Sequence, residues 1–159
     1  MTLYFFIKLV HIVSATLILG TGIGTAFFML TAYRSRDTAA IRVTSRHVVL
    51  ADWIFTAPAV VLQFASGLWL TSFLGISYAS AWLVAALAMF ALVGACWLPV
   101  VWIQIRLSRL IAESSDATLP RRFPILMRAW IALGIPAFIL TLLLFWLMVF
   151  KPGLDYLLF

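Results

Sequence analysis

The sequence predicts an all-α integral membrane protein, a bundle of four transmembrane helices in up-down-up-down order. Composition is the first observation behind this prediction. Of 159 residues, 65% are hydrophobic and 10% are charged, and the mean hydropathy is +1.15. A soluble domain averages about 45–50% apolar and about 25% charged residues. The composition therefore excludes a water-soluble fold.

Four long apolar segments are the second observation, at 3–33, 48–73, 81–105 and 129–150. Each is near or above the roughly 20 residues that span the hydrocarbon core. Their continuity favours helices over barrel strands, which are shorter and alternate in polarity. Apolar sequence also continues well past the core of a signal peptide. We therefore expect a single four-helix transmembrane domain over residues 1–159, with short connections between antiparallel neighbours.

The distribution of charge is the third observation. All nine arginines lie in or beside two linkers, at positions 34, 36, 42, 46, 106, 109, 121, 122 and 128, and the connection 72–80 carries no charge. The positive-inside rule places both arginine-rich linkers in the cytoplasm and both termini outside, in a bacterial inner membrane. The net charge of +6 then reflects topology, so nucleic acid is not an expected partner. The expected partners are the lipid bilayer and either further copies of the chain or a larger membrane complex.

Small residues on the first helix predict close packing. Gly20 and Gly24 form a GxxxG pair with Gly22 between them, a pattern that lets helix backbones approach one another. The alternative is that these glycines admit a flat cofactor beside the helix. Prolines inside the other three helices, which remove backbone hydrogen bonds, predict kinks at Pro58, Pro99 and Pro136.

Ionisable residues inside the membrane are candidates for function, because a polar group in hydrocarbon is costly. Lys8 and His11 lie three residues apart on one face of the first helix. Lys8 can extend outward to the headgroups. His11 lies roughly 12 Å from the outer end and is too short to do so. Its imidazole can ligate a haem iron, bind a metal, relay a proton, or hydrogen-bond to another helix.

Three polar residues on the second helix complete the candidates. Asp52 lies more than a turn inside the membrane, where we expect it to pair with Arg106 or Arg128, the alternative being a proton relay. His47 lies at the cytoplasmic end, where water reaches it. Gln63 lies at a depth similar to that of His11, where it can hydrogen-bond to His11 or to a ligand.

His11 and His47 are too far apart in depth to share one haem iron. About 20 residues, or on the order of 30 Å of helical rise, separate His11 from the cytoplasmic end of its helix. Met89 lies at the depth of His11 and is a candidate second ligand, although methionine in an apolar helix is usually ordinary packing. Lys8, an external partner or no sixth ligand are the other options. No hydrolytic motif is present, and Cys96 is expected to be structural.

Two resemblances follow from these residues. The first helix, with Lys8, His11 and the glycines, resembles helix one of HemJ-type protoporphyrinogen oxidases and CopD-type membrane proteins, which implies that His11 is a haem ligand. Those oxidases also use a lysine on a later helix, and none occurs in 48–150. The stretches HVVLADWIFTAPAVVLQ (47–63) and GACWLPVVWIQIR (94–106) resemble an uncharacterised bacterial membrane family, domain of unknown function 2269.

Three hypotheses of function follow. The first is a small b-type haem-binding protein for electron transfer or porphyrin redox chemistry, with haem b ligated by His11 near Lys8, Gly22 and Met89. The second is a non-enzymatic membrane subunit or scaffold without a cofactor, in which the polar residues hold helices together. The third is proton or metal transport through Asp52, Gln63 and His11.

Overall fold

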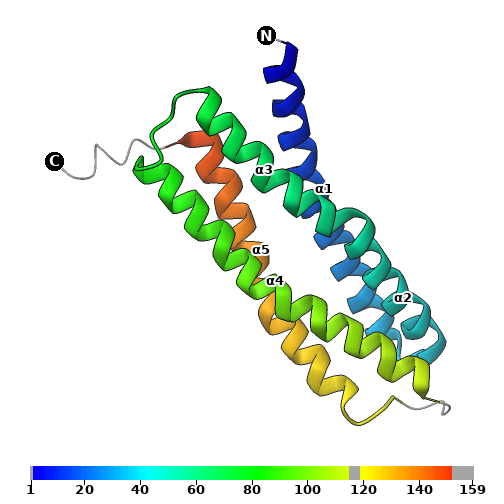
Figure 1. The fold of residues 1–159 in the computed structure, drawn as a ribbon. Coiled ribbons are helices and arrows are strands. Elements are labelled where there is room, and N and C mark those ends of the chain that lie inside the picture. The colour runs from blue at the N-terminus through cyan, green and yellow to red at the C-terminus, as the bar shows by residue number, and fades with distance from the viewer. Residues whose placement is uncertain (1, 115–118, 152–159) are drawn as a thin grey trace.

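A computed structural model of the protein describes residues 2–114 and 119–151, and the spans there are helical throughout (Figure 1). The elements are α1 (Thr2–Ser35), α2 (Thr38–Ala51), the π-helical turn η1 (Asp52–Thr56), α3 (Ala57–Phe73), α4 (Ala81–Glu113) and α5 (Phe123–Phe150). Because α2, η1 and α3 continue as one 36-residue span, four helical spans are long and apolar enough to cross a membrane. The predicted all-α class with four spans is confirmed.

The four spans run in alternating directions. The start of α1, the α3–α4 connection and the end of α5 lie at one end of the molecule, and the other two connections lie at the opposite end (Figure 1). Both arginine-rich linkers therefore share one end, which we call the arginine-rich end. This arrangement is the up-down-up-down order expected from the short connections.

The helices extend beyond the apolar segments at the arginine-rich end. The second span begins at Thr38 instead of 48, α4 continues to Glu113, and α5 begins at Phe123 instead of 129. The apolar pattern marks only the part of each helix within hydrocarbon, whereas helical hydrogen bonding continues past it. At the start of α2, the carboxylate of Asp37 accepts a hydrogen bond of 2.9 Å from the amide of Ala39. This N-cap satisfies one of the free amides of the first turn.

Pro58 shapes the middle of the second span. In a regular α-helix its ring would clash with the carbonyl of Ile54, four residues earlier, and its missing N–H would leave that carbonyl unpaired. The chain instead forms the wider π-helical turn Asp52–Thr56 immediately before it. Such turns are rare and are frequently found at functional sites. Asp52 is the first residue of this turn.

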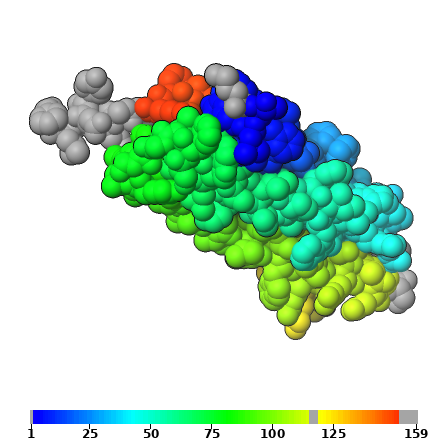
Figure 2. All heavy atoms as spheres, turned by 45° about the horizontal axis from the view of Figure 1, so that its top comes forward, coloured from blue at the N-terminus to red at the C-terminus, as the bar shows by residue number. Residues whose placement is uncertain are grey.

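Packing divides the molecule into two helix pairs. The pair of α1 with α3 and the pair of α4 with α5 make the most extensive contacts, and α2 bridges α1 and α4 (Figure 2). The buried apolar core gathers where the pairs join, toward the arginine-rich end, and consists of Met29, Ala32, Ile41, Val48, Val100, Ile103, Leu107, Ile111, Phe123, Met127 and Trp130. Helices α1 and α5 barely contact one another, and α3 and α4 also make few contacts, although the rings of Phe64 and Phe90 stack between them with centroids 5.8 Å apart. The bundle is thus closed at one end and looser toward the other.

Aromatic side chains gather at the opposite end of the molecule. Tyr4 stacks on Phe73 with ring centroids 5.5 Å apart, and Trp69 stacks on the same ring at 4.9 Å. The ammonium of Lys151 lies 5.5 Å from the ring centroid of Trp82. Aromatic and cationic side chains of this kind are favoured at the membrane–water interface. These contacts join α1 to α3 and α5 to α4 at the outer ends of the two pairs.

The glycines of α1 do not mediate close packing within the chain. A Cβ added at Gly20, Gly22 or Gly24 would meet no atom within 4 Å, so the predicted GxxxG contact is wrong for this chain. The reason is that α1 packs through other positions, including Ser14, Met29 and Ala32, which are buried. A close approach occurs instead at Gly67 of α3.

The membrane orientation predicted by the positive-inside rule can be tested by cysteine labelling. In a Cys96→Ala background, we expect Ser77→Cys in the α3–α4 connection to react with a membrane-impermeant maleimide in intact cells. Ala39→Cys, which is exposed near the start of α2, should react only after the cells are permeabilised. The opposite labelling pattern would place the arginine-rich end outside.

Candidate functional site

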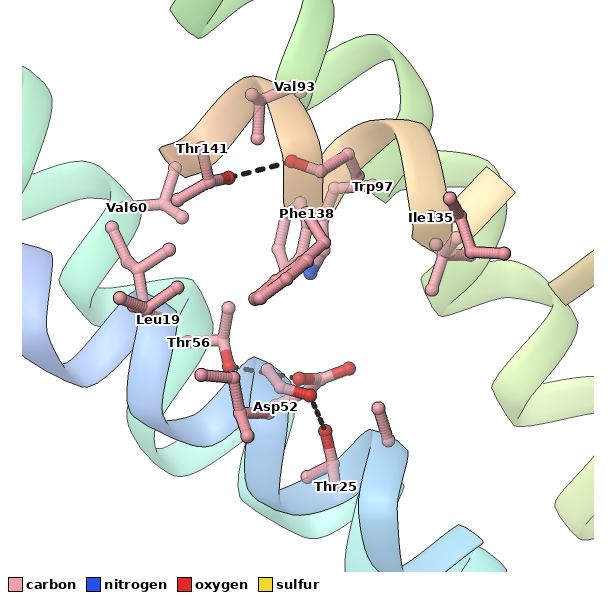
Figure 3. A pocket seen from close by; sticks show the side chains of 18 of the residues that line it. Leu19, Thr25, Asp52, Thr56, Val60, Val93, Trp97, Ile135, Phe138 and Thr141 are labelled. Carbon is pink, nitrogen blue, oxygen red and sulfur yellow. Dashed lines mark hydrogen bonds between the residues drawn. The ribbon is translucent and has the colours of Figure 1, made fainter. Parts of the chain in front are cut away.

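A cavity of about 410 Å³ lies between the two helix pairs (Figure 3). Residues of α1, η1, α3, α4 and α5 line it. Asp52 and Thr56 lie on one side, with Trp97, Phe138 and Thr141 on the opposite side (Figure 3). Small-molecule sites typically enclose about 300–1,000 Å³. The cavity therefore has the size of a binding site for a small organic molecule.

The cavity opens toward the lipid. Four of its lining residues are also exposed on the outside of the molecule, namely Gly22, Ile23 (48%), Ile135 (54%) and Phe138 (41%). They belong to α1 and α5, the helices that barely contact one another. In a membrane this side of the bundle faces hydrocarbon, so the opening between α1 and α5 connects the cavity with the bilayer interior.

Asp52 reaches this cavity from the π-helical turn. Its carboxylate is buried, and Oδ1 accepts a hydrogen bond of 2.9 Å from the hydroxyl of Thr56. The amide side chain of Gln104, on α4, faces the same carboxylate. The second oxygen, Oδ2, has no hydrogen-bond partner among the described residues. One oxygen of the carboxylate is thus held by Thr56, and the other is buried at the cavity wall without a hydrogen-bond partner among the described residues.

The predicted ion pair of Asp52 is wrong. The guanidinium of Arg106 lies over the ring of Trp102, 4.2 Å from its centroid, and both Arg106 and Arg128 are exposed. Residues two apart on a helix do not share a face. Gln104 therefore occupies the side of α4 that faces Asp52, and Arg106 points away from it. The sequence shows that Asp52 and Arg106 lie at similar depth, but it does not show how α4 is rotated about its axis.

Three other polar atoms of the cavity residues are, like Asp52 Oδ2, buried and without a hydrogen-bond partner. Within residues 2–114 and 119–151, Gln63 Oε1, Gln104 Oε1 and Trp130 Nε1 also lack a hydrogen-bond partner, and a fifth such atom, Arg42 Nε, lies at the arginine-rich end. The side chains of Asp52, Gln63, Gln104 and Trp130 are 6%, 8%, 6% and 6% exposed, and all four line the cavity. Buried polar groups are nearly always paired, and each unpaired one costs about 1–3 kcal/mol. Asp52, Gln104 and Trp130 lie toward the arginine-rich end of the cavity, whereas Gln63 lies eleven residues after Asp52 on the same span, or about 16 Å of helical rise. The three unpaired polar atoms toward one end indicate a site for a polar group of a ligand.

His11 joins α1 to α3 beside this cavity. Its Nδ1 lies 2.9 Å from the hydroxyl of Ser66, and its Nε2 lies 3.1 Å from Gln63 Nε2. The Ser66 hydroxyl donates to the carbonyl of Leu62, so it accepts from the protonated Nδ1, and the amide of Gln63 donates to Nε2. The imidazole is therefore neutral and bonded at both nitrogens. The predicted contact between His11 and Gln63 is confirmed.

A glycine makes room for this imidazole. A Cβ added at Gly67 would lie 3.1 Å from Cε1 of His11, a distance too short for ordinary packing. Gln63, Ser66 and Gly67 follow the i, i+3, i+4 spacing of one helix face, and together they receive the ring. Sequence reasoning identified Gln63 but missed Ser66 and Gly67. The signal was present, because both lie one turn after Gln63 on the same face.

The other residues predicted for a cofactor site are not gathered around His11. Gly22 lines the cavity, whereas Lys8 and Met89 do not. Lys8 is exposed, with its ammonium 5.8 Å from the ring centroid of Tyr4, which fits extension toward the headgroups. His47 is exposed on α2. Among the described residues there is also no group of three or more His, Cys, Asp or Glu that could hold a metal ion.

The fold and the cavity define an integral membrane protein with four spans and a largely apolar, lipid-facing cavity that holds a few buried polar side chains. The chain belongs to the family described as predicted integral membrane protein (DUF2269), whose profile matches residues 5–152. This agrees with the resemblance carried by 47–63 and 94–106. Comparison with curated proteins and with solved structures found no match.

A double-mutant cycle tests the bridge between α1 and α3. We expect His11→Ala and Gln63→Ala to be coupled by roughly 0.6–1.7 kcal/mol, the range measured for hydrogen bonds between membrane helices. The free energy of unfolding, measured by titration with sodium dodecyl sulfate in mixed micelles, checks this. Lys8→Ala, one turn earlier on an exposed position, is the control and should show no coupling to Gln63→Ala. A coupling energy near zero for His11 would contradict the bridge.

Proposed function

We propose that this protein binds a lipophilic small molecule, which enters the cavity from the interior of a bacterial inner membrane. The observation that carries this proposal is that three buried side chains with an unpaired polar atom, Asp52, Gln104 and Trp130, line one end of a cavity that opens between α1 and α5. Polar residues within membrane spans commonly mark substrate or ion pathways. The binding of a ligand polar group would supply the missing hydrogen-bond partners.

The two ends of the cavity suggest how the molecule lies. Asp52, Gln104 and Trp130 lie toward the arginine-rich end, and they supply the unpaired polar atoms there. Phe90, Phe145 and other apolar side chains line the remainder. An amphiphile with one compact polar group and an apolar body fits this division. Its polar group would meet Asp52, and its body would lie along α4 and α5 toward the opposite end.

Filling the cavity should abolish binding. Gly134 lines the cavity and an added Cβ there meets no atom within 4 Å, so Gly134→Leu introduces bulk without a clash at the Cβ. We expect native mass spectrometry of protein released from membranes to show a bound small molecule on the wild type and none on Gly134→Leu. Gly20→Leu is the control, because Gly20 is equally open but does not line the cavity. Equal occupancy in all three proteins would contradict the proposal.

Haem binding is a second candidate, supported by a histidine inside the membrane and by Gly22 on the cavity. The arrangement fits it less well, because Nε2 of His11 is bonded to Gln63 and ligation of iron would break that bond. Electron transfer or porphyrin redox chemistry would follow only if the cofactor binds. A cofactor-free subunit of a larger membrane complex is the remaining alternative, in which His11 serves only to join α1 to α3.

A visible absorbance spectrum, recorded with and without dithionite, separates these candidates. If haem b binds through His11, the purified protein shows a Soret band that His11→Ala removes. His47→Ala is the matched control and leaves the band unchanged, because His47 is exposed on α2. The absence of a Soret band, or a band unaffected by His11→Ala, removes the haem candidate.

A further inference from the structure

We propose that the cavity takes a lipophilic cation, of the organic ammonium or phosphonium class, and that Asp52 is its counter-ion. This inference rests on the proposed binding of a lipophilic molecule and names its chemical class. Two independent features of the cavity favour a positive charge: the unmatched carboxylate and the aromatic walls.

No cationic side chain within residues 2–114 and 119–151 lines the cavity beside the carboxylate. Among these described residues, Asp52 is the one ionisable side chain of the lining. The arginines at a similar level on α4 and α5, Arg106 and Arg128, are exposed and turned away. A charge inside a membrane is costly unless an opposite charge accompanies it. A cationic ligand would bring that opposite charge into the cavity.

The walls of the cavity suit a cation with an apolar coat. Phe90, Trp97, Trp130, Phe138 and Phe145 all line it, and Trp97 and Phe138 stand across the space from Asp52 (Figure 3). The faces of aromatic rings attract cations, more strongly when water is excluded. Aromatic rings and a carboxylate together form a receptor for a delocalised or alkylated cation. The opening between α1 and α5 admits such a molecule from lipid.

Binding of radiolabelled tetraphenylphosphonium to the full-length protein in nanodiscs of neutral lipid tests the inference. Scintillation proximity measures the affinity, and triphenylphosphine oxide serves as a neutral aromatic competitor. We expect saturable binding of the cation and displacement by the oxide only at concentrations about tenfold or more above those of unlabelled cation, because the neutral oxide brings no charge to pair with the carboxylate.

Variants of the carboxylate show whether Asp52 is responsible. Asp52→Asn should weaken binding of the cation by at least about tenfold, while Asp52→Glu, which keeps the charge, should restore most of it. Asp37→Asn is the matched control, because Asp37 is an exposed N-cap outside the cavity, and its affinity should equal that of the wild type. A size-exclusion profile and a circular dichroism spectrum of Asp52→Asn equal to those of the wild type show that the variant is folded, and rescue by Glu shows that binding requires the charge.

The outcomes separate this inference from the proposed function. If the wild type does not bind the cation, or if Asp52→Asn binds it as tightly, the cationic class is overturned. The same holds if the neutral oxide competes as well as the unlabelled cation, because the cavity would then select for an apolar molecule. In each case the loss of a bound molecule in Gly134→Leu would still support lipophile binding, and equal occupancy in that variant would overturn both.

Discussion

The hydrocarbon of a bilayer offers no hydrogen bonds, and this constraint governs the structure at every level. Backbone groups satisfy it within helices, which is why the spans are helical. Polar side chains satisfy it in two different ways. His11 is bonded at both nitrogens to α3, whereas Asp52, Gln63, Gln104 and Trp130 line one cavity and each keep a buried, unpaired atom. His11 therefore holds α1 and α3 together, whereas the other four residues contribute to the candidate site.

The cavity depends on how the helix pairs meet. Apolar packing joins them near the arginine-rich end, with Ile41, Leu107 and Phe123 fully buried, and α1 and α5 barely touch. Pro58 adds a local requirement, because the π-helical turn that accommodates it places Asp52 at its start. Pro58 and Asp52, the ionisable residue of the cavity wall, thus belong to the same local irregularity of the second span.

Contacts predicted from depth in the membrane were right where depth alone decides them and wrong where the rotation of a helix about its axis decides them. The contact of Gln63 with His11 followed from their similar depth, and the structure confirms it. The same reasoning paired Asp52 with Arg106, which is wrong because Gln104 occupies the facing side of α4. Gly20 and Gly24 matched a packing motif, yet neither approaches another helix closely within the chain. Helical spacing alone does not reveal which neighbour a face meets.

The sequence by itself determined the four spans, their alternating order and the short list of polar residues inside the membrane. Hydropathy and arginine placement carry this information, because the cost of exposing polar groups to lipid is paid locally along each helix. Only the tertiary structure decided that Asp52 faces an aromatic cavity without an arginine, and that His11 is fully bonded. Those outcomes depend on the rotation of each helix and the separation of the two pairs, which arise from side-chain packing between distant segments.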